Sequence, residues 1–107
     1  MSKNRKLLRK ANLYLILDTN VLSYTQLLGK LDVAVRAGVD IVQLRDKTGK
    51  ACDILEFSKE AKRRIAKKAL YIMNDRIDLA ILSGADGVHL GQEGIPYNQA
   101  RQLMGSK

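Results

Sequence analysis

The chain has 107 residues, of which 46% are hydrophobic and 28% charged, and its formal net charge is +8. This size allows one domain with a modest core, and this composition excludes an intrinsically disordered chain. No apolar run approaches the roughly 20 residues that span a bilayer, and the apolar run LYLIL is too short for a signal peptide. We therefore expect a cytoplasmic protein with no membrane segment.

The first half of the chain alternates between apolar runs and stretches of helical periodicity. A strand is predicted at 13–18 and a helix at 23–38, where a glycine is expected to end it. A second strand is predicted at 39–46 and a second helix at 51–69, with acidic residues early and basic residues late. The residues expected to face the core from these helices are Leu27, Leu28, Leu31 and Val35, then Ile54, Leu55, Ser58, Ala61, Ile65 and Ala69.

The second half repeats the same order. A strand at 70–75 is followed by a short helix at 76–84, and a strand at 85–91 by a helix at 97–105. Repeated strand–helix units with nearly continuous apolar strands predict an α/β fold with a parallel sheet and right-handed crossovers. Four such units make half of a (β/α)8 TIM barrel.

We expect the whole unit, at 13–107, to be a single (β/α)4 half-barrel domain that follows a basic tail at 1–12. An internal repeat supports the regular architecture. The segments AGVDIVQL (37–44) and SGADGVHL (83–90) each contain a glycine, one further residue and an aspartate before a strand. Chance similarity between two helix-to-strand connections remains the alternative explanation.

Polar residues gather where the predicted strands end, which is the edge that carries the active site in (β/α)8 barrels. These residues are Asp18, Gln43, Arg45, Lys47, Asn74, Asp75, His89 and Gln92. The stretch IVQLRDK (41–47) contains Gln43, Arg45 and Lys47 at alternate positions. In a strand these three side chains would point to the same face, unless the strand has already ended at Arg45.

The residue types at this edge fit an anionic ligand. Arg45 and Lys47 could bind a phosphate or diphosphate, with Asn74 as a neutral donor. Asp75 could hold a Mg²⁺ ion that shares the phosphate oxygens. Salt bridges across the rim, between these cations and Asp18 or Asp75, explain the same residues equally well.

The basic residues outside this edge cluster in the tail and in the second helix. The helical cluster consists of Lys59, Lys62, Arg63, Arg64, Lys67 and Lys68. A solvated helix face is the simpler explanation, and the absence of an aromatic stacking platform beside the charge argues against a nucleic-acid surface. Cys52 is the only cysteine, so no internal disulfide can form.

Two motifs and the opening strand make the chain similar to a known family. VQLRDK (42–47), NDRIDLAILSGADGVHLGQEGIP (74–96) and LYLILD (13–18) resemble the N-terminal half of thiamine-phosphate synthases, the thiamine monophosphate synthase and thiazole tautomerase family. The resemblance implies a transferase of thiamine biosynthesis. Such an enzyme joins hydroxymethylpyrimidine diphosphate to thiazole phosphate and releases diphosphate with the help of Mg²⁺.

The resemblance also assigns residues. It implies that Gln43 and His89 face the pyrimidine, and that Arg45, Lys47 and Asn74 bind the diphosphate. Asp75 would be a magnesium ligand. The position of a second family ligand is occupied by Gly94, with Glu93 beside it as a weak substitute.

A half-barrel leaves two strand edges open and its inward apolar side chains uncovered. We therefore expect a homodimer in which two copies complete a barrel. The alternative to an active enzyme is a non-catalytic half-barrel relative that binds pyrimidine phosphates or pairs with a second half-barrel.

Overall fold

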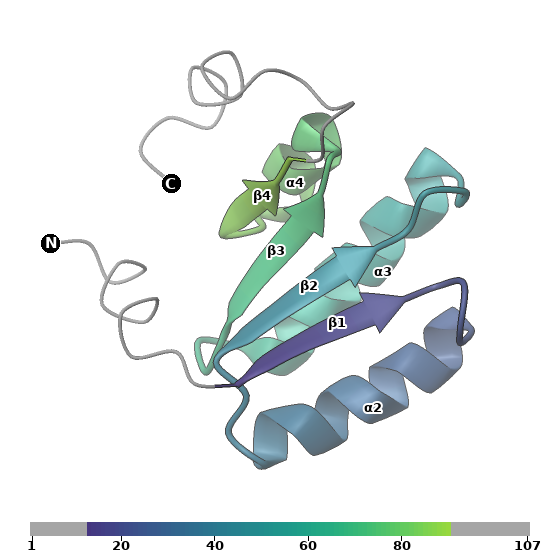
Figure 1. Cartoon of the computed structure of the whole chain (residues 1–107). Coiled ribbons are helices and arrows are strands. Elements are labelled where there is room, and N and C mark those ends of the chain that lie inside the picture. The colour runs from purple at the N-terminus through teal and green to yellow at the C-terminus, as the bar shows by residue number, and fades with distance from the viewer. Residues whose placement is uncertain (1–12, 91–107) are drawn as a thin grey trace, which may run out of the picture.

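A computed structural model describes residues 13–90 of the chain (Figure 1). The elements in chain order are β1 (Tyr14–Asp18), α2 (Tyr24–Arg36), β2 (Ile41–Arg45), α3 (Ala51–Ile65), β3 (Leu70–Asn74), α4 (Ile77–Ser83) and β4 (Gly87–His89). The predicted helix at 97–105, together with Gln92, Glu93 and Gly94, lies outside the described residues. Within residues 13–90, no helix has the length and apolar character needed to cross a bilayer.

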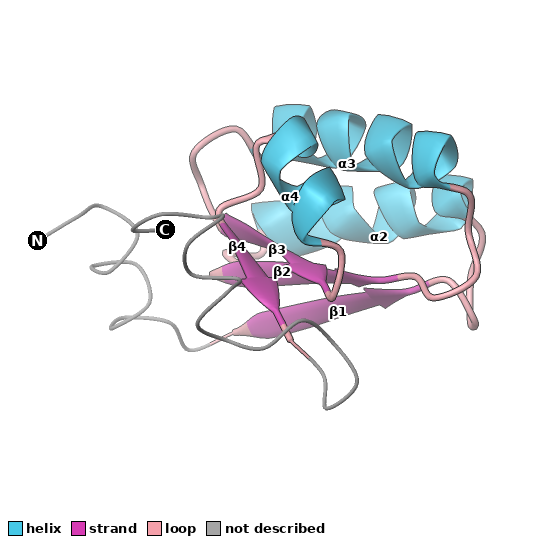
Figure 2. Cartoon of the chain, turned by 90° about the horizontal axis from the view of Figure 1, so that it is seen from above, coloured by secondary structure: helices cyan, strands magenta, loops and turns pink. Residues whose placement is uncertain are grey.

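The strands form one parallel sheet in the order β1-β2-β3-β4, so each strand lies beside its neighbour in sequence. The three helices of the described region pack against the same face of the sheet (Figure 2). This arrangement is the α/β half-barrel predicted from the alternation of strands and helices. The core lies between the two layers, and its largest fully buried side chains are Tyr71, Leu17, Leu31, Leu44, Ile54, Ile65, Met73, Val42 and Ser58.

Local chemistry fixes where α2 begins and ends. The Ser23 hydroxyl accepts a hydrogen bond from the Gln26 backbone N–H, and the Gln26 side chain accepts one from the Ser23 backbone N–H at 3.0 Å. This reciprocal pair is a capping box. After the C-cap Ala37, Gly38 adopts a φ of 92°, which a residue without a side chain tolerates. The glycine predicted to end the helix therefore ends it.

Helix α3 is shorter than predicted, because it ends at Ile65 and not at residue 69. Ala66 takes a φ of 54°, outside the right-handed helical region. Ala69 is buried as expected, but from the connection to β3 and not from the helix. Phe57, which is buried and was not among the predicted core residues, stacks on Tyr24 with ring centroids 4.9 Å apart.

Strands β2 and β4 are also shorter than predicted. β2 ends at Arg45, where the chain turns into the loop before α3. β4 begins only at Gly87, because the chain just after α4 is still bonded to that helix: the Ala85 backbone N–H donates to the Ala80 carbonyl at 2.9 Å. The remaining described boundaries lie within two residues of those predicted.

The internal Gly-x-Asp repeat has the same structural role in both copies. Asp40 donates its backbone N–H to the Leu13 carbonyl, and its carboxylate accepts the Leu13 N–H at 3.1 Å. Asp86 makes the equivalent pair of bonds with Tyr71, each at 2.8 Å. Each aspartate thus joins the start of its own strand to the start of the preceding one, so the two copies of the repeat play the same structural role.

Candidate functional site

Each of the four described strands ends in a polar residue. The last residues of β1, β2, β3 and β4 are Asp18, Arg45, Asn74 and His89. Asp18 pairs in register with Arg45, and Asn74 with His89. Because the strands are parallel, all four residues lie along one edge of the sheet. The structure therefore brings together the strand-end residues that the sequence places there.

The same residues share one face of the sheet. Leu17, Leu44 and Met73 belong to the core beneath the helices, and side chains alternate along each strand. The strand-end residues therefore point away from the helices, onto the face that would line the inside of a barrel. We call this surface the open face.

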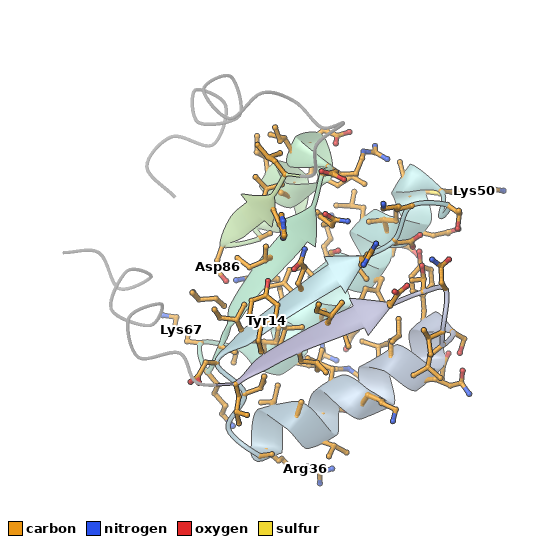
Figure 3. The ribbon with its side chains drawn as sticks, in the orientation of Figure 1. Tyr14, Arg36, Lys50, Lys67 and Asp86 are labelled. Carbon is orange, nitrogen blue, oxygen red and sulfur yellow. The ribbon has the colours of Figure 1, made fainter. Side chains whose placement is uncertain are left out.

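Gln43 also lies on the open face, one pleat below Arg45, and its side chain is only 5% exposed. The Tyr14 hydroxyl donates a 2.6 Å hydrogen bond to its Oε1. Figure 3 shows the Tyr14 side chain on the side of the sheet away from the helices. This bond occupies the amide oxygen and orients the amide group. Tyr14 was not predicted to belong to the site, although its position in β1 places it on the same face of the sheet as Asp18.

Arg45 and Lys47 are exposed, and neither forms an ion pair with another residue in the range 13–90. Asp18 instead accepts the Asn20 backbone N–H at 2.9 Å. The described region thus lacks the rim salt bridges that competed with anion binding as an explanation. Lys47 follows the end of β2, so strand alternation does not place its side chain.

Asp75 occupies an unusual backbone position directly after β3. Its φ is 62°, and its N–H donates to the His89 carbonyl at 2.8 Å. This bond joins the ends of β3 and β4 and sets Asp75 at the same edge as Asn74. No cluster of three metal-binding side chains occurs within the described part of the chain. A Mg²⁺ ion does not require such a cluster, because it commonly keeps several waters and is held by one or two carboxylates plus phosphate oxygens.

Asp46, which was not predicted to belong to the site, lies between the two candidate cations in sequence and is nearly buried, with 9% exposure. It accepts hydrogen bonds from the Tyr24 hydroxyl and from the backbone N–H groups of Thr48 and Gly49, at 3.2 and 2.8 Å for the latter two. Burial raises the pKa of a carboxyl, but here the bonds from Tyr24 and Gly49 outweigh it and lower the pKa of Asp46 below its usual value. Asp46 is therefore an ionised acceptor.

Three of the six residues in the predicted basic cluster, Lys62, Arg63 and Arg64, form intramolecular ion pairs. Arg63 and Arg64 both contact Glu60, and these hydrogen bonds lower the pKa of Glu60 to about 2. Arg64 also contacts Asp32 at 2.7 Å. Lys62 similarly pairs with the Asp86 carboxylate at 3.1 Å. These partners reduce the charge available for a nucleic-acid backbone and favour the simpler explanation of a solvated helix face.

Comparison with known proteins gives consistent matches. The sequence profile of a family described as thiamine monophosphate synthase matches residues 13–107. The chain is 38% identical over 104 residues to the thiamine-phosphate synthase of Methanosarcina barkeri, covering 97% of this chain and 47% of that protein. It is 42% identical over 107 residues to the thiamine-phosphate synthase of Synechococcus sp. (strain WH7803), covering 98% of this chain and 30% of that protein.

The fold gives the same result. The structure superposes on that of a thiamine phosphate pyrophosphorylase from Pyrococcus furiosus with a TM-score of 0.78 and 27% sequence identity. The match covers 95% of this chain and 48% of the other. The chain therefore spans about half or less of the length of these relatives, and the resemblance drawn from its motifs is confirmed.

Proposed function

The chain belongs to the thiamine monophosphate synthase family, and on that premise we propose that it forms the pyrimidine-diphosphate half of a thiamine-phosphate synthase site. The reaction would join hydroxymethylpyrimidine diphosphate to thiazole phosphate with release of diphosphate. One observation carries the proposal. Two cations without ion-pair partners in residues 13–90, Arg45 and Lys47, lie on either side of Asp46 at the strand-end edge that also presents Asn74 and His89.

The pyrimidine would lie on the open face against Gln43. The Tyr14 bond occupies the amide oxygen, so the Gln43 Nε2 group donates to an acceptor such as a ring nitrogen. His89, exposed at the end of β4, would line the same side of the pocket. A ring held in this way fixes the methylene carbon relative to the diphosphate, which is the positional requirement of the reaction.

The diphosphate would lie above the pyrimidine, at the strand ends. Arg45 can contact two of its oxygens at once, Lys47 adds a point charge and Asn74 a neutral donor. Asp75 would hold Mg²⁺ together with phosphate oxygens, and the bound ion would neutralise charge that develops on the leaving diphosphate. Fixed positive groups at this place stabilise the departing anion more than the bound substrate, which is what accelerates the step.

Diphosphate binding tests the proposal directly. We expect Arg45→Ala and Lys47→Ala each to weaken binding of diphosphate, measured by calorimetry with Mg²⁺ present, by roughly tenfold or more. Arg36→Ala is the matched control, because Arg36 is exposed at the other end of the sheet (Figure 3) and should leave the affinity unchanged. An equal loss of diphosphate affinity in all three variants would mean that binding depends only on the net charge of the protein, and it would contradict the proposal.

An assay for product formation distinguishes an active synthase from a non-catalytic relative. Incubation of the chain with hydroxymethylpyrimidine diphosphate, thiazole phosphate and Mg²⁺ should yield thiamine phosphate if the chain is a synthase. Binding of the pyrimidine diphosphate without product would identify a non-catalytic relative.

We also propose that a second copy of the chain covers the open face. Tyr14 and Ile16 are 52% and 51% exposed there, and β1 and β4 are the edges of the described sheet. Unpaired strand edges and adjacent apolar side chains favour association. We expect sedimentation equilibrium to give the mass of a dimer and Ile16→Lys to give a monomer. A folded monomer of the unmodified chain would contradict this arrangement.

A further inference from the structure

Asp46, which lies between the two candidate cations in sequence, joins the loop after β2 to the start of α2. Tyr24, which donates to its Oδ2, is the first residue of α2 and stacks on Phe57 of α3. Thr48 and Gly49, which donate to its Oδ1, lie in the loop between β2 and α3. The carboxylate thus attaches the loop that carries Lys47 directly to α2, and through the stacked Tyr24 ring indirectly to α3.

The start of this loop, at the end of β2, is also held by a backbone hydrogen bond. The Arg45 carbonyl accepts the Thr19 backbone N–H at 3.2 Å, which attaches the end of β2 to the connection between β1 and α2. Gly49 is packed against Asp46, since a Cβ at this position would lie 2.5 Å from Asp46 Oδ2 and 2.7 Å from the Tyr24 hydroxyl oxygen. The segment from Arg45 to Gly49 is therefore fixed although Arg45 and Lys47 are exposed.

We propose that Asp46 and Tyr24 are positioning residues for diphosphate, because they hold the backbone from which Arg45 and Lys47 reach the anion. This inference rests on the proposed function. Long side chains lose conformational freedom when they bind, and a fixed backbone limits that loss to the side chains themselves.

Removal of the Asp46 charge tests the proposal, because electrostatics and positioning predict opposite changes in the affinity for diphosphate. Asp46 is an anion between two candidate anion-binding residues, so its charge alone opposes diphosphate. Asp46→Asn removes that charge, and a purely electrostatic effect would strengthen binding. It also replaces one acceptor oxygen with a donor and disrupts the hydrogen bonds to the loop. A positioning role therefore predicts the opposite sign, weaker binding of diphosphate.

The experiment compares Asp46→Asn and Tyr24→Phe with the control Asp53→Asn, an exposed acid in the first turn of α3. Calorimetry measures diphosphate and, separately, hydroxymethylpyrimidine, which has no phosphate. We expect Asp46→Asn to weaken diphosphate binding by roughly tenfold and Tyr24→Phe by a smaller factor, with pyrimidine affinity unchanged and the control neutral. Trypsin should also cleave after Lys47 faster in Asp46→Asn, and diphosphate should slow that cleavage.

Different results would contradict the positioning role of Asp46 and the proposed function. A parallel loss of both affinities, or tighter diphosphate binding, would overturn the positioning role and leave the proposed function standing. If Arg45→Ala has no effect on diphosphate, the proposed function fails instead, and the rate of trypsin cleavage still decides whether Asp46 holds the loop. Tyr24→Phe keeps the stacked ring and provides the same comparison if Asp46→Asn does not fold.

Discussion

Gly49→Ala is expected to lower the free energy of unfolding by about 1–3 kcal/mol, the usual cost of forcing extra volume into a packed site. The new methyl carbon would meet Asp46 Oδ2 at 2.5 Å and the Tyr24 hydroxyl oxygen at 2.7 Å. Both atoms are ends of side chains, but they are hydrogen-bonded to each other and cannot separate without losing that bond. The methyl group therefore displaces the connection that holds the loop.

Urea denaturation measures the expected loss, and Gly29→Ala is its matched control. Gly29 lies within α2 with nothing within 4 Å of the added carbon. Alanine there should stabilise the protein by roughly 0.5–1 kcal/mol, because glycine is unfavourable inside a helix. If the positioning role is correct, Gly49→Ala also weakens diphosphate binding while Gly29→Ala does not. Unchanged stability of Gly49→Ala would mean that Asp46 and Tyr24 move apart at little cost.

The architecture could be predicted because its signals are local and periodic. The spacing of apolar residues predicts the alternation of strands and helices. Because the strands are parallel, their last residues are then expected at the same edge of the sheet. The predicted edge therefore contains Arg45, Asn74 and His89 as the last residues of their strands. The residues at 91–107 extend this pattern in sequence, but they lie beyond the described part of the chain.

The hydrogen-bond partners in the site could not be predicted, because they connect residues far apart in sequence. Tyr24 reaches Asp46 across 22 positions and Tyr14 reaches Gln43 across 29. No spacing rule distinguishes Asp46 from the charged residues on either side. The end of α3 at Ile65 was missed for a different reason, since the positive φ of the next residue, Ala66, carries no sequence signal in a non-glycine residue.

One polar pair in the core allows a second test of how α3 is attached to the sheet. Ser58 on α3 and Tyr71 on β3 are both fully buried, and their hydroxyl oxygens lie 2.8 Å apart. Burial raises the pKa of Tyr71, so its hydroxyl remains protonated and available for this bond. Ser58 was predicted on the core-facing side of its helix, and the structure supplies the partner that makes a polar residue acceptable there.

We expect Ser58→Ala and Tyr71→Phe each to lower the free energy of unfolding by about 1–3 kcal/mol, because each leaves the other hydroxyl buried without a partner. The double variant removes both polar groups, so its loss should be close to that of one single variant and well below the sum. Urea denaturation of all four proteins gives the coupling energy. Additive losses would show that the two hydroxyls act independently and that apolar packing alone attaches α3 to β3.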